Sequence, residues 1–124
     1  TLAAAKLARS YDMMNVMGAP NVVRGGSHSG NISALSLAEA GLLDVLSSDY
    51  VPASLLHAAF LLHHWAGLSL PEAVGVVALN PARAIGLTDR GEIAAGQRAD
   101  LIRVRLHDDL PIVREVWRGG ARVA

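Results

Sequence analysis

The sequence predicts an α/β fold that changes to antiparallel β-structure near its C-terminal end. Two short apolar runs, residues 14–20 and 42–49, alternate with stretches of strong helix formers, the pattern of parallel strands joined by helices. Beyond residue 100, apolar and charged side chains alternate one by one, as in a strand with one solvated face. Apolar residues make up 52% of the 124 residues and charged residues 18%, so the chain can fill a packed core. We therefore expect residues 1–86 to form the α/β unit and residues 87–124 the β unit.

Each predicted helix combines strong helix formers with a recognisable start or stop signal. The helices are expected in residues 2–10, 32–41, 50–68 (after Pro52), 71–79 and 81–87. Thr1 is the predicted N-cap of the first helix, and Ser69 with Glu72 forms a predicted capping box for the fourth. Asn80 and Pro81 are the predicted N-cap and first residue of the last helix.

The strands follow two patterns. Residues 14–20 are apolar without alternation, so we expect a strand that is buried on both faces. Near the C-terminal end the alternation predicts an apolar face opposite a basic one. The apolar face holds Ile102, Val104 and Leu106, and the basic face holds Arg103 and Arg105. Residues 112–124 are a predicted hairpin that turns on Gly119 and Gly120.

Two parallel strands do not make a complete sheet, because their outer edges would be exposed and apolar. The chain also begins at Thr1 rather than at a methionine. We therefore expect it to be the tail of a larger α/β protein, or to need a partner that supplies the missing strands.

The composition excludes several classes of partner. The formal net charge is zero, so no basic field is available to hold nucleic acid, and no basic helix is typical of a membrane-binding segment. No apolar run reaches the ~18–20 residues of a membrane-spanning helix. The absence of cysteine excludes disulfides, thiolate metal sites and a cysteine nucleophile, and it fits a cytoplasmic protein.

Polar clusters follow both apolar runs, "RGGSHSGN" at residues 24–31 and "SSDY" at residues 47–50. The carboxyl ends of neighbouring parallel strands meet at one edge of a sheet, where ligands of α/β proteins gather. Glycine backbone, an arginine and small donors suit an oxyanion or a phosphate. The predicted phosphate-binding residues are Arg24, Ser27, His28, Ser29, Asn31 and Tyr50.

The glycine-rich cluster has an equally good alternative interpretation as a flexible turn in which Ser29 or Asn31 caps the next helix. It matches neither the phosphate-binding loop of nucleotide hydrolases nor the dinucleotide-binding pattern. The cluster taken alone is therefore a weak indication of a site.

Asp49 is the more specific candidate. An ionised carboxylate beside a buried strand costs free energy unless a metal, a cation or hydrogen-bond donors contact it. Ser47 and Ser48 precede Asp49, and Tyr50 follows it, so we favour a functional role. The alternative is that Asp49 caps the helix that begins near Ala53.

Three histidines, His57, His63 and His64, fall in the predicted helix after Pro52. Adjacent helix positions point about 100° apart and positions seven apart lie about two turns apart, so no pair should chelate one ion. We expect these histidines to be structural or solvated, and His107, in an acidic turn, to be solvated.

Four segments together make the chain familiar. In order they are "GAPNVVRGGSHSGN", "GLLDVLSSDYVPASLL", "NPARAIGL" and "DRGEIAAGQRADLI". They resemble the C-terminal part of the amidohydrolase superfamily of metal-dependent hydrolases. The last two segments are common to that superfamily, whereas "RGGSHSGN" with "SSDYVP" resembles its phosphonate-metabolism branch.

The resemblance implies a distorted (β/α)8 barrel, of TIM-barrel type, plus a small β-sandwich built from both chain ends. Residues 1–86 would hold the last barrel strands and helices, and residues 87–124 the C-terminal part of the sandwich. It also implies that Asp49 belongs to a metal centre, with zinc as the expected divalent ion, and binds the metal or accepts a proton from its water. The complete enzyme would cleave a phosphorylated sugar phosphonate, a triphosphate, to the 5-phosphate and pyrophosphate.

One departure from the family matters. The metal-binding histidines and the bridging lysine or carboxylate of the superfamily are absent, and one carboxylate cannot hold a catalytic zinc that needs about three protein ligands. We therefore expect this chain alone to be inactive. The competing hypotheses are a standalone anion-binding or regulatory module without catalysis and a purely structural domain.

Overall fold

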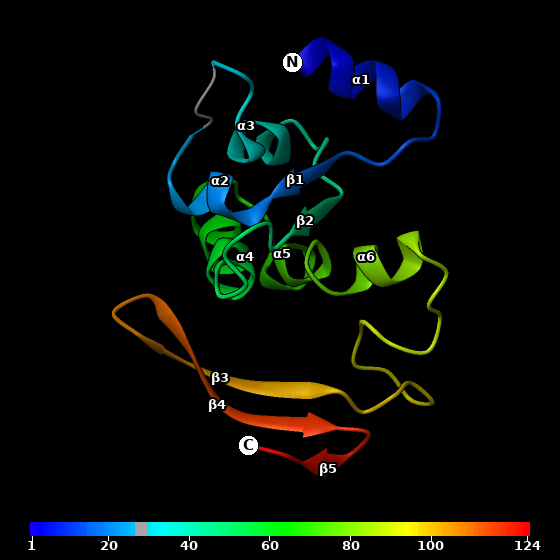
Figure 1. Ribbon diagram of the computed structural model, residues 1–124, viewed down its shortest axis with the longest axis vertical. Helices are drawn as coiled ribbons and strands as arrows, with labels where there is room; N and C mark the ends of the chain where they lie inside the picture. Colours follow the sequence, from blue (N-terminus) through cyan, green and yellow to red (C-terminus); the bar gives the residue numbers. More distant parts are fainter. Residues whose placement is uncertain (27–29) are drawn as a thin grey trace.

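Helices lie on both sides of a two-stranded parallel sheet, and a separate antiparallel sheet lies beyond the helices of one side (Figure 1). The computed structural model describes residues 1–26 and 30–124. The first part of the chain holds α1 (Leu2–Ser10), β1 (Val16–Gly18), α2 (Ala19–Val23), α3 (Ala34–Glu39), β2 (Val45–Ser47), α4 (Ser54–Trp65), α5 (Leu70–Gly75) and α6 (Leu79–Ala84). The second holds β3 (Leu101–His107), β4 (Leu110–Arg118) and β5 (Ala121–Arg122). In Figure 1, α1 and α3 lie on one side of the β1–β2 pair, and α4, α5 and α6 lie on the other.

Strands β1 and β2 pair in parallel, with Val16 opposite Val45 and Gly18 opposite Ser47. The two apolar runs of the sequence are therefore neighbours in space. Burial differs from the expectation for the first strand, because Val16 is 56% exposed while Val45 and Leu46 of β2 are buried. The prediction that β1 is buried on both faces is wrong for this chain. Both strands are edge strands of this two-stranded sheet, but β2 is covered by the segment from α5 to α6, where the Leu46 N–H donates a 3.1 Å hydrogen bond to the Val76 carbonyl.

The first strand is also shorter than its apolar run, because helix α2 begins directly after Gly18. Pro20 lies in the first turn of α2, where its missing N–H costs nothing. The last two residues of the run, Ala19 and Pro20, were expected in the strand because they are apolar. They belong instead to α2, which packs against α4. Short apolar runs do not distinguish strand from buried helix by periodicity.

Capping residues set the starts of three helices. Thr1 caps α1 as predicted, and its Oγ1 accepts a 3.2 Å hydrogen bond from the Ala4 N–H. The capping box of α5 is also confirmed, with Ser69 and Glu72 bonded in both directions. Helix α3 is capped by Ser33, so the alternative that Ser29 or Asn31 caps it is wrong.

The core forms where α2, α3, α4 and α5 meet beside β2. Leu62 of α4 and Val22 of α2 are the largest side chains that are fully buried. Burying one such aliphatic side chain stabilises the fold by about 1.5–3 kcal/mol. The α2–α4 contact therefore anchors the segment that leads from β1 to the first polar cluster.

Asp44, just before β2, is bonded to three other parts of the chain. Its carboxylate accepts hydrogen bonds from the Asn15 N–H at 2.8 Å and from Arg9 at 2.7 Å. Its carbonyl accepts a 2.8 Å bond from the side-chain amide of Asn80. Asn80 lies inside α6, whose N-cap is Ala78, so the prediction that Asn80 caps this helix is wrong. Its amide is used in a long-range contact instead.

The antiparallel sheet has the order β3–β4–β5. Of the predicted apolar face, Val104 is half-buried, whereas Ile102 and Leu106 are exposed like Arg103 and Arg105. A bulge between Arg103 and Val104 shifts the register, and Arg103 pairs with Glu115 of β4 at 2.6 Å. The predicted turn joins β4 to β5, with Gly119 and Gly120 both at positive φ, 57° and 81°.

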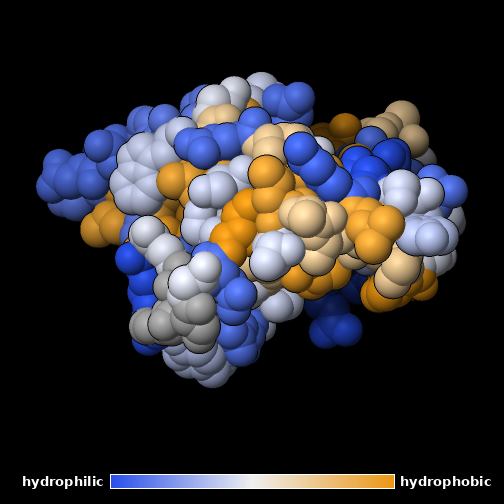
Figure 2. Space-filling view, turned by 90° about the horizontal axis from the view of Figure 1, so that it is seen from above, coloured by the Kyte–Doolittle hydropathy of each residue, from blue (hydrophilic) through white to orange (hydrophobic). Residues whose placement is uncertain are grey.

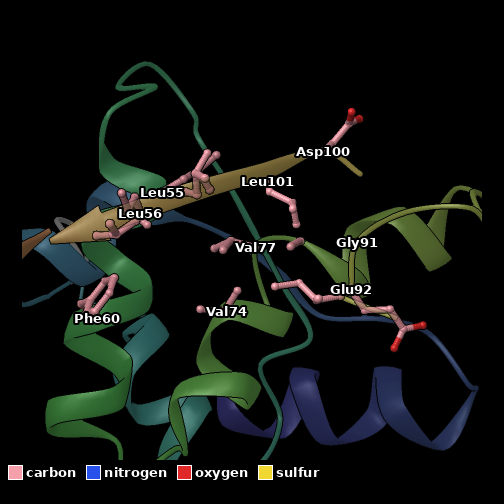
Figure 3. Close-up of a pocket in the computed structure, with 13 residues that line it drawn as sticks. Leu55, Leu56, Phe60, Val74, Val77, Gly91, Glu92, Asp100 and Leu101 are labelled. Carbon is pink, nitrogen blue, oxygen red and sulfur yellow. The ribbon is translucent and has the colours of Figure 1, made fainter. Parts of the chain in front are cut away.

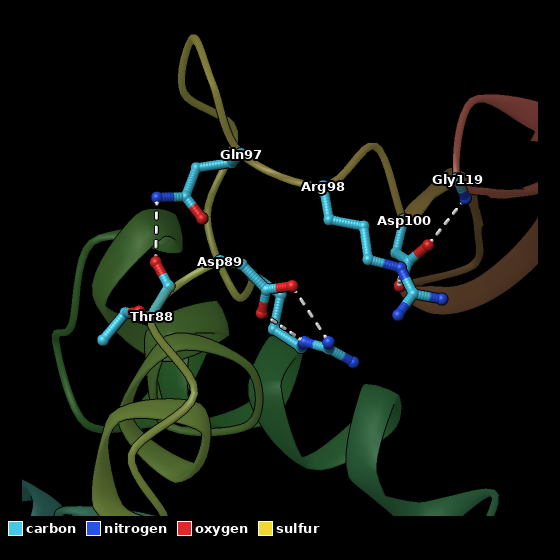
Figure 4. Close-up of polar contacts among 7 residues, drawn as sticks. Thr88, Asp89, Gln97, Arg98, Asp100 and Gly119 are labelled. Atoms are coloured by element: carbon cyan, nitrogen blue, oxygen red, sulfur yellow. Dashed lines mark hydrogen bonds and ion pairs between the residues drawn. The ribbon is translucent and has the colours of Figure 1, made fainter.

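The segment between α6 and β3 is held by local polar contacts (Figure 4). Asp100 accepts a 2.8 Å bond from the Gly119 N–H and pairs with Arg98 at 2.8 Å. The Gly119 N–H, together with Arg98, lowers the pKa of the Asp100 carboxyl below its ordinary value. Gly91 has φ 101°, and a Cβ there would lie 2.8 Å from Leu79 Cα, so this segment packs backbone to backbone on α6.

Apolar side chains also reach the surface. In the view from above, they gather across the middle of the face, with hydrophilic residues around them (Figure 2). Exposed apolar residues of the N-terminal part include Leu7, Met13 and Val16. In the part of the chain that the structure describes, no helix combines the length and the apolar character needed to cross a membrane.

Candidate functional site

The candidate site lies past the carboxyl ends of β1 and β2. Because Gly18 and Ser47 are register partners, the residues that follow them leave the sheet on the same side. Asp49 comes two residues after Ser47, with φ 51°, a left-handed conformation that aspartate tolerates better than most residues. Its carboxylate lies directly against Gly18, so close that a Cβ on Gly18 would be 2.9 Å from Asp49 Oδ2.

The surroundings of Asp49 differ from the sequence-based argument in one respect. Asp49 is exposed, so the expected cost of burying its charge beside the strand does not arise in this chain. The capping alternative is wrong as well, since α4 begins at Ser54 with Ala53 as its N-cap and without a side-chain cap. Within residues 1–26 and 30–124, the Asp49 carboxylate makes no hydrogen bond or ion pair, and only its backbone carbonyl accepts a bond, from Ser48 Oγ at 3.5 Å.

Arg24 and Tyr50 meet at this end of the sheet. Arg24 follows α2 as its C-cap, and its Cζ lies 5.3 Å from the centre of the Tyr50 ring. A guanidinium at this distance over an aromatic face is a cation–π contact. The structure thus brings Arg24 to Tyr50, the residue next to Asp49, although α2 intervenes between β1 and the polar cluster that was expected to follow the strand directly.

Of the remaining predicted phosphate-binding residues, the structure describes only Asn31. Ser27, His28 and Ser29 lie outside the described residues. Asn31 is exposed, and among the described residues no hydrogen bond joins it to Asp49 or Tyr50.

The histidines lie elsewhere. His63 Nδ1, near the end of α4, is 2.7 Å from the carbonyl of Leu68 in the segment that follows this helix, and His64 lies 3.6 Å from Asp109 of the β3–β4 turn. His107, expected in a turn, is instead the last residue of β3; it is exposed, and its Nε2 lies 3.6 Å from Asp108 Oδ2. The described part of the chain contains no group of three or more His, Cys, Asp or Glu side chains that could hold a metal ion.

An apolar pocket of about 420 Å³ lies between α4, α5 and β3, away from the predicted site residues (Figure 3). Leu55, Phe60, Val77 and Leu101 are among the residues that line it. An apolar lining does not suit a phosphate group, and none of the predicted site residues contributes to it.

Sequence reasoning missed the contact between Gly18 and Asp49. The one available signal was a glycine inside an apolar run, which marks either a bulge or a close approach of another group. The group that approaches comes from the next strand, and the sequence does not indicate it.

Comparisons with known proteins extend this description. A model of the amidohydrolase family matches residues 5–124. The chain is 52% identical over 125 residues to alpha-D-ribose 1-methylphosphonate 5-triphosphate diphosphatase of Escherichia coli (strain K12), a match that covers 99% of this chain and 33% of that protein. It is also 45% identical over 65 residues to imidazolonepropionase of Deinococcus deserti, covering 46% of this chain and 16% of that protein.

The fold has a counterpart among solved structures. An amidohydrolase from Thermotoga maritima MSB8 superposes with a TM-score of 0.75 at 20% identity, covering 98% of this chain and 34% of that one. The chain thus has an amidohydrolase-like α/β fold, and it spans about a third of the length of these two relatives. The family resemblance that the order of the sequence motifs indicated is confirmed.

Proposed function

Since this chain belongs to the amidohydrolase family, we propose that it is the C-terminal part of a metal-dependent hydrolase that cleaves α-D-ribose 1-methylphosphonate 5-triphosphate to the 5-phosphate and pyrophosphate. The proposed substrate rests on the 52% identity, over nearly the whole chain, to a diphosphatase named for that compound. Both polar clusters that resemble the phosphonate branch lie inside the matched region.

In the complete protein, β1 and β2 would be the last two strands of a (β/α)8 barrel. Residues 1–86 would belong to the barrel, and residues 87–124 would form the C-terminal part of a β-sandwich. The exposed edge of β1, with Val16 at 56% exposure, supports this arrangement because a neighbouring strand would cover it.

Asp49 would be the contribution of this chain to the metal centre. An exposed carboxylate just past the carboxyl end of a parallel strand suits a divalent ion, but one carboxylate does not suffice for a catalytic zinc. The other ligands would come from the rest of the complete protein, so the chain alone would be inactive. The chemistry that a divalent metal supplies in such a site is a lowered pKa of bound water, toward ~7. Asp49 would orient the attacking water and accept its proton at a carboxylate oxygen.

The triphosphate would lie over the other side of the site, against Arg24. A guanidinium donates two parallel hydrogen bonds to phosphate oxygens, a strong and directional contact. The Tyr50 ring, 5.3 Å from Arg24 Cζ, would keep the guanidinium beside Asp49. The small polar residues of the same cluster would supply further donors, namely Ser27, His28, Ser29 and Asn31.

The test of this function is Asp49→Asn in the complete protein that carries this sequence. Asparagine has the same shape and also tolerates the left-handed backbone, so the fold should persist. We expect pyrophosphate release from the ribose phosphonate triphosphate to be abolished while the melting temperature stays close to that of the native protein. Asp12→Asn is the matched control, because Asp12 is also exposed and has a similar φ of 56°. Near-normal turnover by Asp49→Asn would remove Asp49 from the mechanism.

A standalone anion-binding module is the second candidate, since Arg24 and Tyr50 meet without help from another chain. Titration of the 124-residue chain with pyrophosphate tests it: saturable binding supports an anion site, and its absence favours a structural domain. An in-frame His-x-His segment upstream of Thr1 would decide in favour of the hydrolase.

A further inference from the structure

Gly18 occupies a position whose backbone does not require glycine. It ends β1 with φ −78° and ψ 131°, an extended conformation that any L-amino acid adopts. Glycine in a strand forfeits side-chain packing and loses more conformational freedom on folding than other residues. Neither the strand nor the start of α2 therefore explains why glycine is present here.

The space around Gly18 gives the reason. A Cβ on Gly18 would lie 2.9 Å from Asp49 Oδ2, 3.4 Å from Asp49 Cβ and 3.5 Å from Asp49 Cγ. All three of its nearest atoms thus belong to one side chain, which lies against Gly18. Among the described contacts of the other glycines, Gly75 leaves ordinary space, with Asn80 Oδ1 at 3.9 Å, and Gly91 is crowded by backbone atoms.

We propose that Gly18 is a positioning residue for the Asp49 carboxylate, which occupies the space that a side chain at residue 18 would fill. The backbone of Asp49, at φ 51°, turns away from the direction of β2. Because Gly18 at the end of β1 has no side chain, the Asp49 carboxylate can lie against this neighbouring strand. The carboxylate is thereby held at the carboxyl end of β1, from which α2 leads to Arg24. The mechanistic meaning of this inference rests on the role proposed for Asp49.

A side chain at residue 18 would move the carboxylate and spare the fold. The closest conflict is with the tip of a flexible, exposed side chain, which can rotate away, rather than with backbone. Alanine also restricts the unfolded chain more than glycine does, which favours the folded state where φ is unstrained. The substitution therefore separates the position of the carboxylate from stability.

The experiment is Gly18→Ala in the complete protein, compared with Gly75→Ala as a matched control that has room for a methyl group. We expect Gly18→Ala to lower kcat about 100-fold, the scale of a misplacement by about 1 Å, with little change in KM for the triphosphate. Its melting temperature should be unchanged or slightly higher, and its crystal structure should show the Asp49 carboxylate rotated off residue 18. Gly75→Ala should keep kcat, KM and the carboxylate position.

The outcomes separate this inference from the proposed function. Normal kcat and an unmoved carboxylate in Gly18→Ala, beside an inactive Asp49→Asn, would overturn the role of Gly18 alone. Normal kcat in both variants would overturn the role of Asp49 and the inference with it. A Gly18→Ala protein that loses activity together with its folding transition would show a structural role and would also overturn the inference.

Discussion

The guanidinium of Arg24 lies over the ring of Tyr50, with 5.3 Å between Cζ and the ring centroid. Arg24 ends α2 and Tyr50 follows β2, so the contact joins the two segments that leave neighbouring strands. Asp49 immediately precedes Tyr50, and its carboxylate lies on Gly18 at the end of the other strand. The two segments therefore meet at two points, the cation–π contact of Arg24 with Tyr50 and the close approach of the Asp49 side chain to the Gly18 backbone.

Replacement of Tyr50 tests whether its ring positions Arg24. Tyr50→Phe keeps the aromatic face, whereas Tyr50→Leu removes it. An exposed cation–π contact contributes about 0.5–1 kcal/mol, so Tyr50→Leu should raise KM for the triphosphate about 2- to 5-fold in the complete protein, with kcat unchanged. Steady-state kinetics measure this. An equal rise in Tyr50→Phe would assign the effect to the hydroxyl group and contradict the prediction.

Arg24→Ala should weaken binding of the triphosphate more strongly. A hydrogen bond between charged groups contributes about 1.5–3 kcal/mol, which corresponds to a rise in KM of about 10-fold or more. Arg24→Lys should fall between Arg24→Ala and the native protein, because it keeps the charge and loses the two-pronged contact. An unchanged KM in Arg24→Ala would exclude Arg24 from phosphate binding.

Asn80→Ala should destabilise the protein by about 1–3 kcal/mol, because the half-buried Asp44 carbonyl loses its 2.8 Å donor. Equilibrium unfolding in urea measures the change. Arg83→Ala on the same helix is the control, since its 3.4 Å ion pair with Glu92 is exposed and should contribute less than about 1 kcal/mol. Equally small effects in both variants would show that Asn80 does not hold α6 to β2.

The capping box of α5 should make stability depend on pH. The Ser69 hydroxyl, together with its backbone N–H, lowers the pKa of the Glu72 carboxyl below its ordinary value. Such a group stabilises the fold above the pKa that it has in the unfolded chain, and this stabilisation is lost as pH falls through its folded pKa.

Glu72→Gln removes the titrating group and so tests this dependence. The difference in melting temperature between the native protein and Glu72→Gln should be larger at about pH 6 than at about pH 3. Thermal unfolding followed by circular dichroism measures it. A difference that is the same at both pH values would contradict the assignment.

Local signals predicted most of the helices and the C-terminal hairpin. Thr1, the Ser69–Glu72 pair and the Gly119–Gly120 turn work through contacts between residues that are close in sequence, so their patterns alone are informative. Helix α2 was missed because a short apolar run fits both a strand and a buried helix, and only its packing against α4 selects the helix.

The order of the residues thus specified most of the elements, with α2 as the exception. It marked Asp49 as the polar residue after β2, whereas the Arg24 cluster, expected directly after β1, follows α2 instead. The partners of Asp49, Arg24 and Asn80 required the three-dimensional arrangement. Parallel strands have no turn to set their register, which depends on packing between distant residues. The pairing of Gly18 with Ser47 brings the Asp49 carboxylate onto Gly18, and no local pattern encodes that contact.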